Sequence, residues 1–319
     1  HTGDYYNLDE SLPKDLPSVI ANTKLKEDYN MNTTHMILVD SSVAGSDVKK
    51  MSQEIEKVDG VKWVLGLDNL IGSGVPADML PESVTGMLKN DKYQLLMVNS
   101  TYKVATDKVN KQIEQIDKIM DKYDKGAMLV GEGPLTKDLI NITDTDFKRV
   151  SAVSIGIVFV IILLLFKSVT IPVILVGVIE FAIFVNMGIP FYTGTKLPFV
   201  ASIVIGTIQL GATVDYAILM TTRYQRERSR GAGKFDAITT AHKFSAQSII
   251  VSALSFFAAT IGVGLYSNID MISSLCILMA RGALISMVVV VLILPSLFMV
   301  FDKIIVKTSK GFRPSDLKS

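Results

Sequence analysis

The chain has 319 residues, of which 49% are hydrophobic and 20% are charged, and its formal net charge is +1. Residues 1–147 contain 16 basic and 24 acidic side chains, whereas residues 148–319 contain 16 basic and 7 acidic ones. The acidic first part gives no reason to expect nucleic acid as a partner, because phosphates demand a basic face. Since the apolar residues gather in the second part, the composition predicts two different domains rather than one soluble fold.

The chain begins at His1, with no basic segment and apolar run ahead of the first domain. We therefore expect no signal peptide and interpret the sequence as a segment of a longer protein. Cys276, the only cysteine, lies in an apolar run, where a buried core role is expected. The residue pattern predicts no enzyme, no cofactor and no metal site.

Residues 1–147 carry two successive strand–helix–strand patterns. The first combines a buried strand at 35–40, a helix and a strand at 61–67, and the second combines a strand at 93–102, a helix and a strand at 126–131. The apolar residues at helical spacing are Val48, Met51, Ile55 and Val58 in the first helix and Val109, Ile113, Ile116 and Met120 in the second. This order predicts an α+β domain with the ferredoxin-like βαββαβ fold.

The segment at about 70–90 carries Gly and Pro and is expected as an insert between the second and third strands of this domain. Its Gly72 and Gly74 do not stand between a strand and a helix, as the glycines of a phosphate-binding loop do. We interpret them as loop residues, and the domain as a scaffold.

Residues 148–303 contain five apolar stretches, each near the length of about 20 residues that a helix needs to cross a bilayer. They lie at roughly 150–166, 169–189, 198–220, 244–265 and 272–301. This pattern predicts an α-helical membrane domain of five transmembrane helices. Because five crossings are an odd number, residues 1–147 and the tail at 304–319 are expected on opposite sides of the membrane.

The basic residues of the membrane domain gather on one side of the predicted spans. They are Lys167 in the first loop, Arg223, Arg226, Arg228, Arg230, Lys234 and Lys243 in the longer loop, and Lys303, Lys307, Lys310, Arg313 and Lys318 in the tail. Since cytoplasmic loops carry the excess of Lys and Arg, this side is predicted to be cytoplasmic and residues 1–147 extracytoplasmic. The segment at about 229–242 is expected to lie along the inner surface as a short amphipathic helix.

Three charged residues fall inside the predicted spans, where each costs at least about 2.5 kcal/mol and function is the default expectation. Glu180 lies eight residues beyond Pro172 and Asp215 eight residues before Arg223, so both are predicted to lie about 12 Å deep from the cytoplasmic side, level with each other and able to share or relay a proton. A structural contact with a partner subunit is the alternative for Glu180. Arg281, roughly 32 Å from the cytoplasmic end, is expected to anchor the outer edge, with Asp270 as a candidate partner.

Polar residues accompany Asp215 on two of the spans. They are Ser245, Ser248, Ser252 and Ser255 at spacings of three and four in the fourth span, and Gln209, Thr213 and Tyr216 next to Asp215 in the third. The serines either complete a polar track beside Asp215 or, as small residues, allow close helix packing, and the sequence favours neither.

The most specific motif is the run GATVDYAILMTTRYQRER at 211–228. It has an Asp-Tyr pair deep in a span and an Arg-Tyr pair with an acidic residue at the cytoplasmic end: Asp215, Tyr216, Arg223, Tyr224 and Glu227. This arrangement resembles the MMPL branch of the resistance-nodulation-division (RND) superfamily of bacterial membrane transporters. Weaker similarity at 9–17, 294–295 and 301–303 extends the resemblance over nearly the whole chain.

The resemblance implies a role for the Asp-Tyr pair. In this family such intramembrane pairs take part in proton translocation, which implies that role for Asp215 and Tyr216 and carries none over to Glu180. It also implies proton-driven export of lipids or other hydrophobic compounds across the bacterial cell membrane, with residues 1–147 as a porter-type domain. The chain is similar to one half of such a transporter without its first helix, so a second half or a second copy is an expected partner, besides the bilayer, the substrate and protons.

Three other interpretations compete with this one. A SecDF-like protein-translocation factor shares the architecture, but an Asp-Ala or Asp-Val step followed by Glu-Arg would be expected there. A sterol-sensing or Patched-like receptor would be favoured by extracellular disulfides, and residues 1–147 have no cysteine. An intramembrane aspartyl protease needs two opposed Asp residues, and the spans offer Asp215 no such partner.

Overall fold

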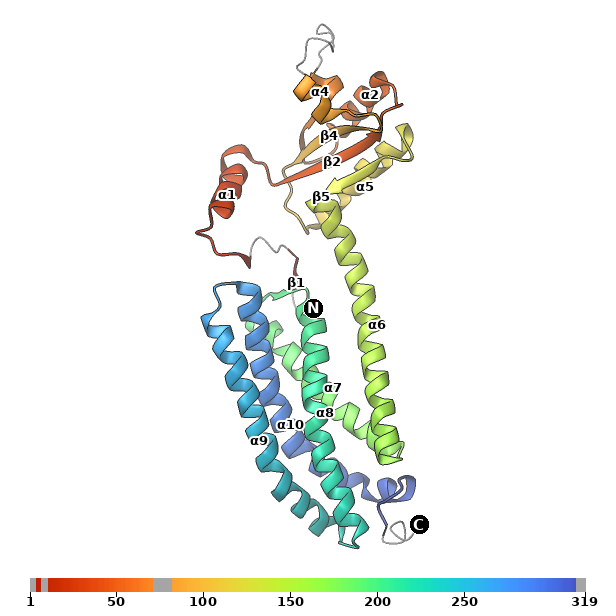
Figure 1. Cartoon of the computed structure of the whole chain (residues 1–319), viewed down its shortest axis with the longest axis vertical. Helices are drawn as coiled ribbons and strands as arrows, with labels where there is room; N and C mark the ends of the chain where they lie inside the picture. The colour runs from red at the N-terminus through yellow and green to blue at the C-terminus, as the bar shows by residue number, and fades with distance from the viewer. Residues whose placement is uncertain (1–3, 7–10, 71–81, 314–319) are drawn as a thin grey trace. The chain divides into compact units, whose positions relative to one another are not determined.

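The computed structural model of the chain describes residues 4–6, 11–70 and 82–313 (Figure 1). The contacts within it divide the chain into two units, one at Tyr6–Asp144 and one made of His1–Tyr5 with Thr145–Ser319. Each unit has an apolar core of its own, as expected for separate structural domains.

A four-stranded antiparallel sheet forms the centre of the Tyr6–Asp144 unit. Its strands are β2 (Thr33–Asp40), β3 (Val61–Leu65), β4 (Tyr93–Ser100) and β5 (Met128–Gly131), in the order β3-β4-β2-β5. Helix α2 (Gly45–Ile55) connects β2 to β3, and α5 (Asp107–Tyr123) connects β4 to β5. Strand β4 lies between β2 and β3 in the sheet, and β2 lies between β4 and β5. The two repeats are therefore interleaved, which confirms the predicted ferredoxin-like fold.

The apolar faces predicted for the two helices are buried in this unit. They are Val48, Met51 and Ile55 of α2 and Val109, Ile113, Ile116 and Met120 of α5, together with Ile37, Val39, Leu96 and Val98 of the sheet. Full burial of one such side chain contributes about 1.5–3 kcal/mol. Packing of the apolar face, rather than intrinsic helix propensity, therefore holds the helices on the sheet.

Three helices in the described part of this unit lie outside the two repeats. The sequence pattern did not predict α1 (Pro17–Tyr29), because its apolar residues do not share one face and none of its residues is buried. Helix α3 (Leu67–Leu70) ends where the insert expected at 70–90 begins, and α4 (Glu82–Leu88) lies near the end of that insert. Gly72 and Gly74 lie outside the described residues.

One histidine is buried in the sheet of this unit. His35 of β2 is fully covered, and its Nε2 lies 3.4 Å from Oε1 of Gln112 in α5, whose Nε2 donates to the Asp59 carbonyl. Its Nδ1 has no partner among the described residues, and a Cβ atom at Gly133 would approach the ring to 2.5 Å. Burial holds the pKa of His35 below its usual value of 6.5, so the neutral ring is the stable form.

We expect the sheet of this unit to lose stability as the pH falls below about 6.5. In that range the unfolded chain binds a proton at His35 that the buried ring does not bind, so acid favours unfolding, whereas at higher pH this group contributes no pH dependence. Hydrogen exchange of the β2 and β5 amides in the full chain, corrected for intrinsic rates, measures the effect. His35→Gln should lose the dependence and His242→Gln should keep it, and an unchanged dependence in His35→Gln would contradict the assignment.

The second unit consists mainly of long helices. They are α6 (Glu132–Phe166, from Thr145 on), α7 (Thr170–Thr193), α8 (Ala201–Ser229), α9 (Lys234–Tyr266) and α10 (Asp270–Thr308). Within the described residues these five helices are long and apolar enough to cross a membrane, as predicted, and the chain is a multi-pass membrane protein. The short strands β1 (Asp4–Tyr5) and β6 (Leu197–Pro198) pair in parallel in the same unit.

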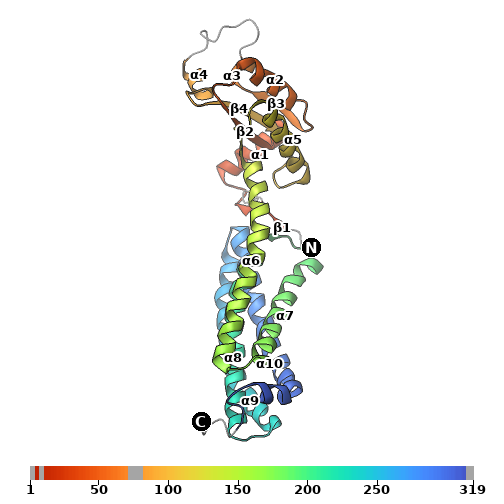
Figure 2. The ribbon, with the colours of Figure 1, turned by 90° about the vertical axis from the view of Figure 1, so that its right-hand side faces the viewer.

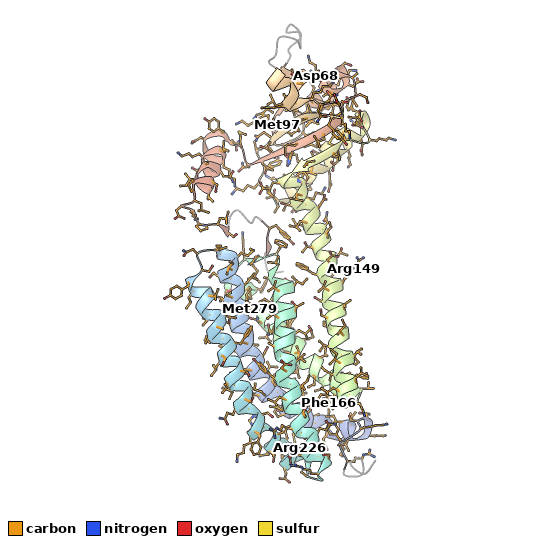
Figure 3. The ribbon with its side chains drawn as sticks, viewed as in Figure 1. Asp68, Met97, Arg149, Phe166, Arg226 and Met279 are labelled. Carbon is orange, nitrogen blue, oxygen red and sulfur yellow. The ribbon has the colours of Figure 1, made fainter. Side chains whose placement is uncertain are left out.

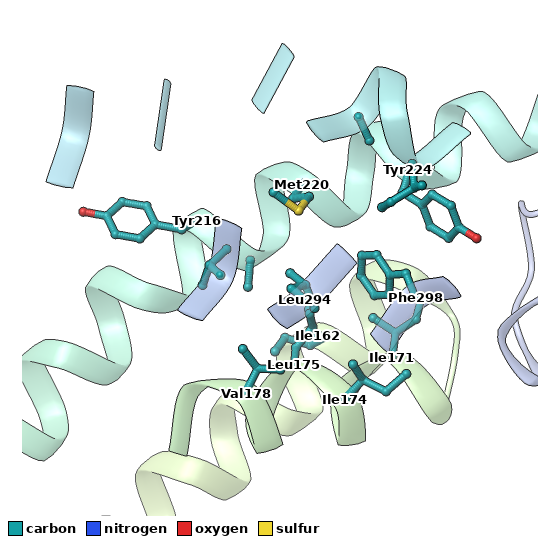
Figure 4. Packing of buried hydrophobic residues seen from close by; sticks show 14 of the residues in the cluster. Ile162, Ile171, Ile174, Leu175, Val178, Tyr216, Met220, Tyr224, Leu294 and Phe298 are labelled. Carbon is teal, nitrogen blue, oxygen red and sulfur yellow. The ribbon is translucent and has the colours of Figure 1, made fainter. Parts of the chain in front are cut away.

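Helix α10 is the central helix of this unit and packs against α7, α8 and α9 (Figures 1 and 2). The core between them is apolar and includes Ile171 and Leu175 of α7, Met220 of α8 and Leu294 and Phe298 of α10 (Figure 4). Helix α6 joins this core through Ile162 and through Phe166 at its end (Figure 3). No other part of the described chain covers most of the remaining α6 surface, and Leu164 on it is 67% exposed.

The segment at about 229–242 does not form the separate amphipathic helix that we predicted. The chain turns at Gly231, where φ is +92°, and the helix that begins at Lys234 continues without a break to Tyr266. Its buried residues recur at helical spacing from the start: Ala237, Ile238, Ala241, Ser245, Ile249 and Ala253. One continuous face therefore packs on the bundle, and no Gly or Pro interrupts 234–261.

Candidate functional site

Asp215 and Tyr216 lie near the middle of α8 and point in different directions, because consecutive helical residues are rotated by about 100°. Tyr216 is 7% exposed and belongs to the apolar core (Figure 4), whereas Asp215 is exposed. Ile208 and Gly211, which share the Asp215 face of the helix, are exposed as well. The carboxylate therefore projects away from the bundle, and no described residue forms a hydrogen bond with it.

A buried polar network, here called the α7–α8–α10 network, joins three helices. Asn186 of α7 donates through Nδ2 to Oε1 of Gln209 at 2.9 Å and to the Leu278 carbonyl at 3.1 Å. Gln209 of α8 donates to Oγ of Ser286 in α10 at 3.0 Å, and Oγ1 of Thr213 lies 2.7 Å from the same oxygen. All four polar side chains are buried, where a missing hydrogen bond would cost about 1–3 kcal/mol.

The network brings Gln209 and Thr213, which were predicted as supporting residues, together with two residues that the sequence pattern did not single out. Asn186 and Ser286 stand as isolated polar residues in apolar runs, and that was the available signal. The helices approach closely here, because a Cβ atom at Gly282 would lie 2.7 Å from Nδ2 of Asn186 and 2.7 Å from Oε1 of Gln209. Only glycine leaves room for these hydrogen bonds.

Arg281 of α10 belongs to the same network. Its Nε donates to Oδ1 of Asn186 at 2.8 Å, and its Nη2 donates to the Asn186 carbonyl at 2.9 Å. The candidate pairing of Arg281 with Asp270 is wrong. Asp270 begins the same helix eleven residues earlier, about 16 Å away along the axis, which is further than an arginine side chain reaches.

Glu180 and Asp215 lie at a similar height in the bundle. Asn186 and Gln209 are hydrogen-bonded across α7 and α8, which run in opposite directions, and the two carboxylates each lie six residues further toward the α8–α9 loop. Six residues correspond to about 9 Å on either helix. No hydrogen bond joins the carboxylates within the described part of the chain, so a proton shared between them stays a prediction.

The predicted serine stripe of α9 has two kinds of members. Ser245 is fully buried, and its Oγ has no partner among the residues that the structure describes. The exposed members are Ser248, Ser252 and Ser255. One turn beyond Ser252, Phe256 lines a crevice between α8, α9 and α10 together with Tyr216. This stretch of α9 is therefore beside Tyr216, and a polar track that reaches Asp215 stays a prediction.

The Arg-Tyr end of α8 forms a buried cluster with α10. Tyr224 donates to Oδ1 of Asp302 at 2.5 Å, and Arg228 donates through Nη2 to Oδ2 at 3.0 Å. The Nε atom of Arg228 lies 3.0 Å from Oδ1 as an ion-pair contact without a hydrogen bond. The Tyr224 ring stacks on Phe298 at a centroid distance of 5.0 Å. Tyr224 is fully buried and the Asp302 side chain is 9% exposed. The cluster fastens the end of α8 to α10.

The other two residues of the predicted cytoplasmic motif, Arg223 and Glu227, stand on either side of Arg226 in the sequence, and Arg226 is labelled at this end of α8 in Figure 3. Arg223 is exposed and Glu227 is half-buried. The Arg223 guanidinium lies over the Phe244 ring of α9 at 6.0 Å, and Glu227 forms an ion pair with Arg230 at 3.0 Å. Exposed contacts of these kinds contribute at most about 1 kcal/mol each. Within this motif, Tyr224 therefore has the largest structural role.

Comparison with known proteins gives matches over most of the chain. The model of the family described as "MMPL family" matches residues 12–313. The chain is 24% identical over 274 residues to "Putative membrane protein YdgH" of Bacillus subtilis (79% of this chain, 28% of that protein). It is 23% identical over 280 residues to "Probable transport protein MmpL1" of Mycobacterium tuberculosis (79% and 27%).

A solved structure shares the fold. The crystal structure of a heavy metal efflux pump matches with a TM-score of 0.52 and 12% identity over 83% of this chain and 35% of that one. The chain spans between a quarter and a third of the length of the two curated relatives. The family match over residues 12–313 covers both the Asp-Tyr helix and the ferredoxin-like domain, and it confirms the resemblance that the motif indicated. The chain therefore belongs to the MMPL family.

Proposed function

We propose that this chain is part of a membrane transporter that uses the proton motive force to export lipids or other hydrophobic compounds. The observation that carries the proposal is Asp215, an uncovered carboxylate near the middle of an apolar helix. A charge at membrane depth costs at least about 2.5 kcal/mol, so its presence indicates function. Membership of the MMPL family and similarity to a probable transport protein support the same function.

In the proposed mechanism Asp215 takes up a proton from one side of the membrane and releases it to the other. The neutral form suits an apolar surrounding, whereas the ionised form needs a polar or charged one. Each change of protonation therefore changes which surface the uncovered face of α8 contacts. Because Asp215 projects away from its own bundle, we assign that surface to a second half or a second copy of the transporter.

The α7–α8–α10 network is not the proton path in this proposal. Side-chain amides donate and accept hydrogen bonds without readily passing on a proton, and the fixed charge of Arg281 repels an approaching one. We assign the path to the uncovered face of α8 that holds Asp215, with the exposed serines of α9 as further candidate members. Glu180, at a similar height on α7, is a secondary proton site in this scheme, with a contact to a partner subunit as the alternative.

We place the α8–α9 loop and the tail in the cytoplasm and the Tyr6–Asp144 unit outside a bacterial cell membrane, as a porter-type domain. The excess of Lys and Arg at the loop end supports this orientation. In a Cys276→Ser background, Lys234→Cys should react with an impermeant maleimide only in inverted vesicles, whereas Asp91→Cys should react on intact cells. Labelling of Lys234→Cys on intact cells would show that the proposed orientation is the wrong way round.

Reconstitution of the full-length protein in liposomes with an imposed pH gradient tests the function. We expect a fluorescent hydrophobic compound to be transported only while the gradient exists, and transport to stop when a protonophore collapses it. Transport at the same rate without a gradient would rule out proton coupling. If the protein dissipates the pH gradient but transports no hydrophobic compound, the proposed substrate class is ruled out.

A further inference from the structure

Arg281 is built into the bundle rather than free to move to the membrane surface. Its Nε and Nη2 both donate to Asn186 of α7, and Asn186 is itself bonded to Gln209 of α8. An arginine near a helix end usually extends its flexible side chain toward the headgroups. Arg281 is instead held in one orientation by two neighbouring helices.

No carboxylate in the described part of the chain pairs with this cation. Both of its acceptors belong to Asn186, one a side-chain amide oxygen and one a backbone carbonyl, and both are neutral. The Nη1 group has no partner among the described residues, and the side chain is partly exposed. Because an unpaired charge at membrane depth costs at least about 2.5 kcal/mol, the free edge of the guanidinium favours an anion.

Two exposed apolar residues share the Arg281 side of α10. Ile277 and Val288, four residues before and seven after Arg281, lie on the same side of α10 and are 39% and 48% exposed. Arg281 also lies about 16 Å along α10 from its start at Asp270, and its two hydrogen bonds to Asn186 hold the guanidinium at that height. A fitting ligand has an apolar chain and an anionic group that is brought to this depth.

We propose that Arg281 binds the anionic headgroup, a phosphate or a carboxylate, of an amphiphile that enters from the membrane. A planar guanidinium offers parallel N–H donors that match two oxygens of such a group. Because Nε and Nη2 donate to Asn186, Nη1 is the nitrogen that is available to the ligand. The apolar chain of the ligand lies along Ile277 and Val288. The inference names a substrate class and in that respect rests on the proposed function, although binding can be measured without transport.

Equilibrium binding to the full-length protein in zwitterionic nanodiscs tests the site with hexadecyl phosphate and hexadecanol, which differ only in the headgroup. We expect the phosphate to bind at least about tenfold more tightly, the effect of one charge-assisted hydrogen bond. Arg281→Gln should remove this difference and leave the affinity for hexadecanol unchanged, whereas Arg281→Lys should keep part of it. Arg149→Gln, at an exposed position of α6 (Figure 3), is the matched control and should change neither affinity.

Several results would overturn the site. Equal affinities for both compounds in the wild type would do so. An equal loss of affinity for both compounds in Arg281→Gln would also do so, because it would mean that Arg281 supports the fold rather than the headgroup. Competition by inorganic phosphate at the same concentration would assign the site to a free anion. Loss of subunit association in Arg281→Gln without a headgroup preference would assign Arg281 to a carboxylate of a partner subunit. Because binding is measured without a gradient, failure here leaves proton coupling untouched, and failure of proton coupling leaves this binding site untouched.

Discussion

Transport driven by a pH gradient is expected to fall by about 100-fold or more when Asp215 is replaced by Asn in the full-length protein. Asparagine keeps the shape and polarity of the side chain but does not exchange a proton. Since no described residue forms a hydrogen bond with Asp215, the substitution leaves no buried group unpaired. Stability should therefore change by less than about 0.5 kcal/mol, and membrane insertion should be normal. Initial transport rates in liposomes, normalised to the amount of inserted protein, measure the effect.

Two further variants separate proton exchange from general polarity. Asp236→Asn, at an exposed position in the first turn of α9, is the matched control and should transport normally. Asp215→Glu keeps an exchangeable proton and should retain part of the activity. Gradient-driven transport at the wild-type rate in Asp215→Asn would remove Asp215 from the mechanism, whatever the behaviour of the controls.

Replacement of Asp302 by Ala is expected to destabilise the membrane unit by about 3–5 kcal/mol. The substitution leaves Arg228 as an uncompensated, largely buried charge and removes the acceptor of the Tyr224 hydroxyl. The end of α8 then loses its fastening to α10. The free energy of unfolding in detergent micelles measures the effect.

A neighbouring ion pair supplies the control for this substitution. Glu227→Ala breaks the pair with Arg230, whose side chain is 54% exposed, and should change the free energy of unfolding by less than about 1 kcal/mol. Similar losses in Asp302→Ala and Glu227→Ala would show that the buried cluster does not fasten the helices. An Asp302→Ala protein that is as stable as the wild type would lead to the same conclusion.

Local periodicity predicted the elements that bury one clear face. The helices α2 and α5 followed from apolar residues at helical spacing, and the alternation of strands and helices then predicted the ferredoxin-like order. Helix α1 was missed because no face of it is apolar. The start of α9 was misplaced because charged residues such as Lys234 and Asp236 lie among apolar ones, which is typical of a surface helix, whereas its buried stripe continues into the span.

The sequence by itself determined the two domains, the five membrane-crossing helices and the Asp215-Tyr216 pair, because hydropathy, charge and short-range spacing are local properties. Only the tertiary structure decided that Tyr216 faces the core while Asp215 faces out. It also decided that Arg281 binds Asn186, 95 residues away, and that Arg228 binds Asp302, 74 residues away. Such partners depend on how each helix is rotated and shifted against its neighbours, and that follows from the packing of whole helix faces rather than from the spacing within one helix.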